Sequence, residues 1–196
     1  LKIKKLLYVF ILVNIVICDD FNTWLNQFKS IFNSDIISIN MEYELKSESE
    51  IFQSIPKTGA KILYSPKNSK LKFETPEMIF ISDVDNWKNL NKKTNQMIID
   101  NHADSTIIKI SKYFDYNYLK NLNKTKINNK KFLLTIDDFE IIVKVSKKPY
   151  KIDKIIFDMD VIKYYFYNIT FSKSNQIHKN PFAMNVEQLE IFDLRE

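Results

Sequence analysis

The stretch Ile37-Ser-Ile-Asn-Met-Glu-Tyr-Glu-Leu-Lys46 alternates apolar and polar residues from one end to the other. Successive side chains of a β-strand point to opposite faces of the sheet, so a period of two predicts a strand with one apolar face and one wet face. Sheets with one wet face are typical of antiparallel architectures. This stretch therefore predicts a sheet that buries one face against a core and leaves the other in water.

Shorter strands of the same kind are predicted further along the chain, at a spacing of roughly ten residues that is typical of an antiparallel meander. Turn-forming residues separate them, as in Ser65-Pro-Lys-Asn-Ser69 and Asn91-Lys-Lys-Thr-Asn95. The predicted strands cover residues 62–64, 70–75, 78–82, 96–100, 131–136, 139–145, 154–159, 161–171 and 189–192.

Two regions have helical periodicity instead. Residues 19–34 place six apolar side chains, among them Trp24 and Phe28, on one stripe at a spacing of three and four. Residues 104–123 interrupt the meander with near-helical spacing and predict one or two short helices, and residues 121–131 predict a long exposed turn. We therefore expect an α+β fold: a strongly curved antiparallel sheet, or incomplete β-barrel, covered by an N-terminal helix and inserted lid helices.

The first 18 residues have the pattern of an export signal. Three lysines precede an apolar run of 13 residues that ends at Cys18, which is shorter than the roughly 20 residues needed to span a bilayer. We predict a signal peptide over residues 1–18, a single domain over residues 19–196 and an exported, periplasmic location. The alternative is lipidation of Cys18, although the large Ile17 before it is unusual for a lipoprotein signal.

The composition excludes several classes of function. The chain has 29 basic and 24 acidic residues, a net charge of +5; without residues 1–18 it has 26 and 24, a net of +2, which argues against a nucleic-acid partner. Gly59 is the only glycine, so glycine-rich nucleotide loops and nucleophile elbows are absent. The two histidines lie in no metal or triad pattern. We expect no enzyme, no metal site and no cofactor.

The apolar face of the sheet and the aromatic stripe of the helix leave two alternatives. They either pack into a solid core or enclose a cavity for a lipid-like ligand.

The ordered set Gly59, Pro66, Pro76, Ser82-Asp83 and Gln96 resembles the LolA-type periplasmic lipoprotein carriers. The resemblance is clearest over residues 57–100, and Trp87 falls one position early in it. It implies an incomplete barrel that binds the acyl chains of lipoproteins released from the inner membrane and carries them toward the outer membrane. Its partners would be acylated lipoproteins, an inner-membrane lipoprotein-releasing transporter and an outer-membrane receptor.

The resemblance and the strand pattern together assign two sets of residues. The expected lipid cavity consists of Ile39, Met41, Tyr43, Tyr64, Leu71, Phe73, Ile79, Ile81 and Trp87. The expected lid consists of Trp24, Phe28, Ile107, Ile110 and Phe114.

Two departures from the family pattern concern the lid. Ser65 stands where the family has an arginine that bonds to the lid, and Val84 stands where it has a glycine. Closure must then use other contacts, either Lys67 or Lys70 or apolar packing by the helix. If Cys18 is lipidated, the chain is similar instead to the membrane-anchored LolB-type receptors.

Overall fold

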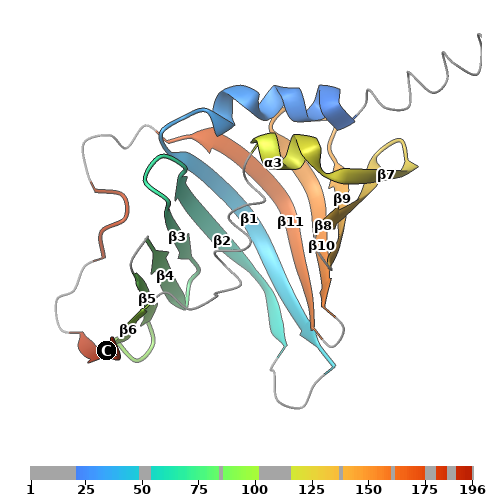
Figure 1. The fold of residues 1–196 in the computed structure, drawn as a ribbon. Helices are drawn as coiled ribbons and strands as arrows, with labels where there is room; N and C mark the ends of the chain where they lie inside the picture. The colour runs from blue at the N-terminus through green and yellow to red at the C-terminus, as the bar shows by residue number, and fades with distance from the viewer. Residues whose placement is uncertain are drawn as a thin grey trace, which may run out of the picture.

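The computed structural model describes residues 21–48, 54–83, 86–101, 116–136, 139–159, 162–174, 180–184 and 189–195. Within these ranges, twelve strands form one sheet in the order β12-β6-β5-β4-β3-β2-β1-β11-β10-β9-β8-β7 (Figure 1). The strands are β1 (Ile37–Ser47), β2 (Ile55–Ser65), β3 (Lys70–Glu74), β4 (Met78–Ser82), β5 (Asn86–Asn91), β6 (Gln96–Asn101), β7 (Asn123–Asn128), β8 (Lys131–Ile136), β9 (Phe139–Val145), β10 (Lys151–Met159), β11 (Ile162–Lys173) and β12 (Glu190–Asp193).

The predicted fold class is confirmed: the sheet is large, curved and unclosed, with β12 and β7 as its edges (Figure 1). Its neighbouring strands pair antiparallel, except that β12 lies parallel to β6. The chain therefore returns from β11 at the middle of the sheet to its far edge to add the last strand.

Two strands escaped the sequence prediction. β5 has the sequence Asn-Trp-Lys-Asn-Leu-Asn, in which only two of six residues are apolar. β7 has the sequence Asn-Lys-Thr-Lys-Ile-Asn, and the prediction of an exposed turn over residues 121–131 was wrong there. An edge strand is held by backbone pairing along one side, here to β8, so it needs no alternating apolar pattern.

A helix over residues 21–32, called the N-terminal helix below, and α3 (Tyr116–Asn121) lie across one end of the curved sheet (Figure 1). The helix carries its predicted stripe into the main core: Leu25 and Phe28 are each 1% exposed. The helices predicted in residues 104–123 are represented by α3, because residues 102–115 lie outside the described residues.

One row of side chains crosses eight strands on the inner face of the sheet. In register, the row is Phe171, Ile39, Ile62, Phe73, Phe80, Asn89, Ile98 and Phe192. Its first three members are buried, whereas Ile98 is 36% and Phe192 41% exposed. We call β1, β2 and β8–β11 the covered half, because its inner face packs against the helices, and β3–β6 with β12 the outlying half.

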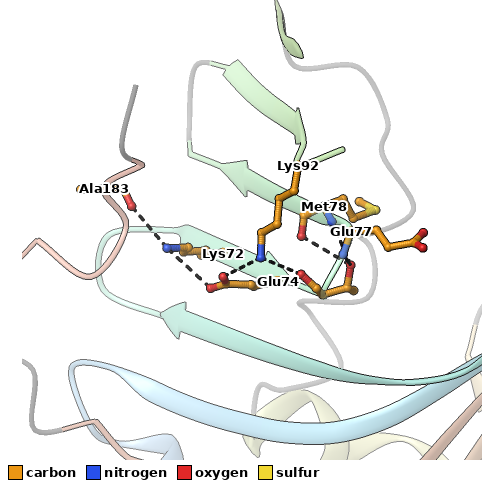
Figure 2. Close-up of polar contacts among 7 residues, drawn as sticks. Lys72, Glu74, Glu77, Met78, Lys92 and Ala183 are labelled. Carbon is orange, nitrogen blue, oxygen red and sulfur yellow. Dashed lines mark hydrogen bonds and ion pairs between the residues drawn. The ribbon is translucent and has the colours of Figure 1, made fainter. Parts of the chain in front are cut away.

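Polar contacts tie the outlying half together (Figure 2). The Lys92 ammonium donates to Glu74 Oε1 at 2.9 Å and to the Thr75 carbonyl oxygen at 2.7 Å. Lys72 lies 3.8 Å from the other carboxylate oxygen of Glu74 and donates to the carbonyl of Ala183 at 3.3 Å. Burial acts to raise the pKa of Glu74, but the Lys92 hydrogen bond and the ammonium charges of Lys72, Lys92 and Lys61 outweigh it and lower that pKa.

Candidate functional site

A small cavity lies between the N-terminal helix, α3 and the inner face of the covered half. Its volume is about 60 Å³. The lining is apolar throughout and consists of Phe21, Trp24, Leu25, Phe28, Phe32, Met41, Ile62, Leu119, Leu134, Ile141, Val143, Ile152, Ile155, Phe157, Phe166, Ile169 and Phe171. These residues come from both helices and from β1, β2 and β8–β11, so the cavity sits at the centre of the covered half.

Contacts between aromatic rings pack the N-terminal helix over this cavity. The Phe28 ring meets Phe171 of β11 at a centroid distance of 5.0 Å and an interplanar angle of 73°. Phe21 meets Phe132 of β8 at 5.1 Å and 65°, and Trp24 lies between the two, 4.7 Å from Phe28. Edge-to-face pairs of this kind are favourable, and they require no polar partner.

One buried polar atom of the cover lacks a partner. Among the described residues, the Trp24 indole Nε1–H forms no hydrogen bond although its atom is buried. A buried hydrogen-bond donor without a partner lowers stability by about 1–3 kcal/mol. The covered arrangement therefore contains a local penalty that moving the helix away from the sheet would remove.

The polar ties of the cover lie at its edge. Lys124 of β7 donates to Asn22 Oδ1 at 3.0 Å, and its ammonium stands 5.2 Å from the centre of the Phe21 ring. The hydroxyl of Tyr116 in α3 donates to Asn26 Oδ1. These contacts are partly exposed, so each contributes modestly and can be exchanged for water.

Ser65 and the two lysines considered for lid closure, Lys67 and Lys70, lie together where β2 leads into β3. Ser65 is fully buried and accepts a hydrogen bond from Asn68 in its own turn at 3.1 Å. Lys67 of the same turn and Lys70 at the start of β3 are exposed. Helix closure uses the other alternative, apolar packing by Trp24 and Phe28.

The structure divides the nine expected cavity residues into three groups. Met41 lines the cavity. Ile39, Tyr43, Tyr64, Leu71, Phe73 and Trp87 belong to the main core or pack against it, beside the cavity rather than on its wall. Ile79 and Ile81 point away from it: Ile79 packs on a second cluster of Leu90, Met97 and Ile99, and Ile81 lines a hollow of about 280 Å³ with Lys70 and Lys88.

The placement of Ile79 and Ile81 corrects their assignment to the cavity. In β4 the inner face belongs to Phe80, which pairs across the strands with Phe73 and stacks on Trp87 at 5.9 Å. Met-Ile-Phe-Ile is apolar at every position, so its sequence contains no alternation from which the inner face could be chosen.

Of the expected lid, Trp24 and Phe28 form the centre of the cover. Ile107, Ile110 and Phe114 fall in residues 102–115, outside the described residues.

Most of the cavity wall was missed by the sequence reasoning. β8–β11 contribute nine of the lining residues, including Leu134, Ile141 and Phe166. The resemblance was clearest over residues 57–100, which supply only Ile62 to the wall. The alternation in Ile141-Ile-Val-Lys-Val145 was the available signal, because it marks the inner positions of β9.

The chemistry of this site is that of an apolar container. Among the residues that the structure describes, no charged side chain lines the cavity, and burial raises the pKa of Tyr43 and of Tyr164 near it. Within the described ranges, no group of three or more His, Cys, Asp or Glu residues is placed to hold a metal ion. The part of the chain that the structure describes also contains no helix long and apolar enough to span a bilayer.

The fold has relatives among solved structures, although no protein family and no curated protein matches the sequence. An uncharacterized conserved protein from Thermus thermophilus aligns with a TM-score of 0.52 over 88% of this chain and 98% of its own, at 10% identity. A LolA superfamily protein from Nitrosomonas europaea aligns with a TM-score of 0.40 over 83% and 97%, also at 10% identity. The first similarity shows a shared fold.

Proposed function

We propose that the protein is a carrier that binds acyl chains in the cavity beneath the N-terminal helix. The observation behind the proposal is a cavity that the described residues line wholly with apolar side chains, under a helix whose central tryptophan N–H has no partner among those residues. The resemblance over residues 57–100 directs the proposal to lipoproteins: an exported carrier would take them from an inner-membrane transporter toward an outer-membrane receptor.

The size of the cavity requires the helix to move. An apolar cavity of about 150 Å³ holds one benzene molecule, so a cavity of about 60 Å³ cannot hold an acyl chain. The chain would instead occupy the volume that Trp24 and Phe28 fill. Helix and ligand then compete for the same apolar wall, which permits both uptake and release.

The energies are compatible with reversible binding. Each buried methylene contributes about 0.8 kcal/mol, so ten methylenes contribute about 8 kcal/mol before the cost of displacing the helix. Relief of the unpartnered Trp24 N–H returns part of that cost. No covalent step is needed.

Native mass spectrometry with a synthetic triacylated lipopeptide tests the proposal, and two neighbouring isoleucines provide matched variants. Ile155 lines the cavity, whereas Ile156 of the same strand points to the outer face, and both are half-buried. We expect a one-to-one complex that Ile155→Asp weakens at least tenfold and Ile156→Asp leaves within about twofold, because only the first places a charge beside the acyl chains.

Two results would contradict the proposal: the absence of any complex with the lipopeptide, or equal weakening by the two variants. Binding of a free fatty acid distinguishes a general carrier of apolar ligands from a carrier selective for lipoproteins. Equal affinity for fatty acid and lipopeptide would support an apolar-ligand carrier and contradict selectivity for lipoproteins.

A further inference from the structure

The positive charge of the chain is concentrated in one region. Residues 116–154 contain ten lysines and four acidic residues, a net of +6, whereas the whole chain has a net of +5. The remaining residues therefore have a net charge of −1. This region forms α3, β7, β8, β9 and the start of β10, which lie together at one edge of the sheet (Figure 1).

Two neighbouring turns gather part of this charge at one end of the sheet. The β7–β8 turn carries Lys130 and the β9–β10 turn carries Lys147 and Lys148, all exposed. The turns are neighbours, because the N–H of Val145, at the end of β9, donates to the Lys130 carbonyl at 2.8 Å. We call these three lysines, together with Ile127 and Tyr150, the basic end.

A row of lysines continues from the basic end onto the outer face. Lys131 of β8 is opposite Lys144 of β9, and Lys144 is opposite Lys154 of β10. Like charges directly opposite one another across strands are destabilising. The Lys154 ammonium lies over two aromatic rings, 4.7 Å from the centre of Tyr165 and 5.0 Å from that of Tyr167, whereas Lys131 and Lys144 form no ion pair with an acid of the described residues. An external anionic surface would offset their mutual repulsion.

Two large apolar side chains of the basic end are exposed. Ile127 is 48% and Tyr150 42% exposed, and in the described part of the chain the other large apolar side chains with such exposure lie at β6, at β12 and just after β12. Tyr150 also has a φ of 54°, a left-handed conformation that bulky residues rarely adopt and that asparagine adopts readily. Tyr150 therefore occupies a position where its backbone is strained.

The basic end adjoins the cover of the cavity. The Tyr150 ring lies 6.0 Å from Phe28 of the N-terminal helix, in an edge-on arrangement. Lys124 of β7 binds Asn22 of the same helix. The basic end therefore lies beside the helix that covers the cavity.

We propose that the basic end docks on an anionic lipid bilayer. Lysines are attracted to anionic headgroups, and exposed tyrosine and isoleucine side chains partition into the interface between headgroups and acyl chains. An acidic protein partner is the competing occupant, and it predicts no binding to vesicles that contain lipid alone. The proposal goes beyond the carrier function and does not rest on it, because docking on an empty vesicle requires no cargo.

Vesicle flotation tests the proposal with the chain from Asp19 onward, since residues 1–18 would bind any bilayer and the core draws on residues from 21 on. The probes are vesicles of phosphatidylcholine alone and with 30% phosphatidylglycerol. We expect binding to the anionic vesicles only, released by 0.5 M salt because screening shortens the reach of the lysines.

The decisive comparison is between two double variants, each of which replaces two lysines by glutamate in a different part of the sheet. Lys147→Glu with Lys148→Glu should weaken binding to anionic vesicles at least tenfold. Lys67→Glu with Lys70→Glu, exposed in the β2–β3 turn and at the first position of β3, should change it less than threefold. Equal weakening by both pairs would mean that only net charge acts and would overturn the proposal, as would the absence of binding to anionic vesicles.

Tyr150→Asn removes the exposed ring of the basic end. Asparagine suits the positive φ, whereas the lost ring contact with Phe28 costs stability, so we expect a small change in the urea midpoint of unfolding and at least threefold weaker vesicle binding. Unchanged vesicle binding would contradict the role of Tyr150. The lipopeptide assay on the same proteins reports separately on the carrier function, so either proposal can fail without the other.

Discussion

The covered and outlying halves of the sheet share strand pairing but differ in what covers their inner face. In the covered half, Ile39 and Ile62 of the cross-strand row are buried in the main core. In the outlying half, the same row reaches Ile98 and Phe192, both more than one-third exposed. Backbone pairing alone thus extends a sheet, whereas burial of its inner face depends on a second layer.

We expect the largest difference between the halves in the free energy of unfolding, when one phenylalanine in each is replaced by alanine. Phe28→Ala should lower the free energy of unfolding by about 3–5 kcal/mol, because it empties a site packed by four other aromatic rings. Phe192→Ala should change it by no more than about 0.5 kcal/mol, since that ring is 41% exposed. Urea unfolding followed by circular dichroism measures both, and similar losses would show that the outlying half is buried in solution.

A smaller effect is expected from the two tryptophans. Trp24→Phe should cost less than about 1 kcal/mol, because the loss of ring area is offset by removing an unpartnered buried N–H. The control is Trp87→Phe in the outlying half, where no unpartnered N–H is removed. We expect the control to be at least as destabilising in urea unfolding. A cost above about 2 kcal/mol for Trp24→Phe would contradict the penalty assigned to its indole.

The smallest effect concerns the ion pairs of the outlying half. The folded-state pKa of Glu74 is lowered, so its contribution is present above the unfolded pKa and is lost as the pH falls through the folded pKa. Glu74→Gln should therefore cost about 0.5 kcal/mol at pH 7, a value typical of partly exposed pairs, and almost nothing near pH 3. Urea unfolding at the two pH values measures the difference, and Glu77→Gln, in the exposed pair with Lys93, is the control. A cost that stays the same at both pH values would mean that the effect is not electrostatic.

The fold was predictable where local pattern and final burial agree. Residues 37–46 alternate because one face of β1 packs on the core, and residues 19–34 repeat at helical spacing because one stripe covers the sheet. β5 and β7 were missed because both have few apolar residues. Each is held by backbone pairing with a neighbouring strand, which leaves no alternating side-chain pattern in the sequence.

The candidate site was predictable in part. Trp24, Phe28 and Met41 came from periodicity and line the cavity. Ile79 and Ile81 could not be placed correctly, since β4 is apolar on both faces and the choice of face is made by what packs against each. The share of β8–β11 in the wall depends on long-range pairing of β11 with β1, which no local pattern encodes.

The sequence by itself determined the types of element and their apolar faces, because periods of 2 and 3.6 are properties of a few consecutive side chains. Only the tertiary structure decided which half of the sheet is covered, where the cavity lies and that the lysines of three strands stand side by side. Those features depend on strand order and register, which bring residues more than 100 positions apart, such as Ile39 and Phe171, into direct contact across the sheet.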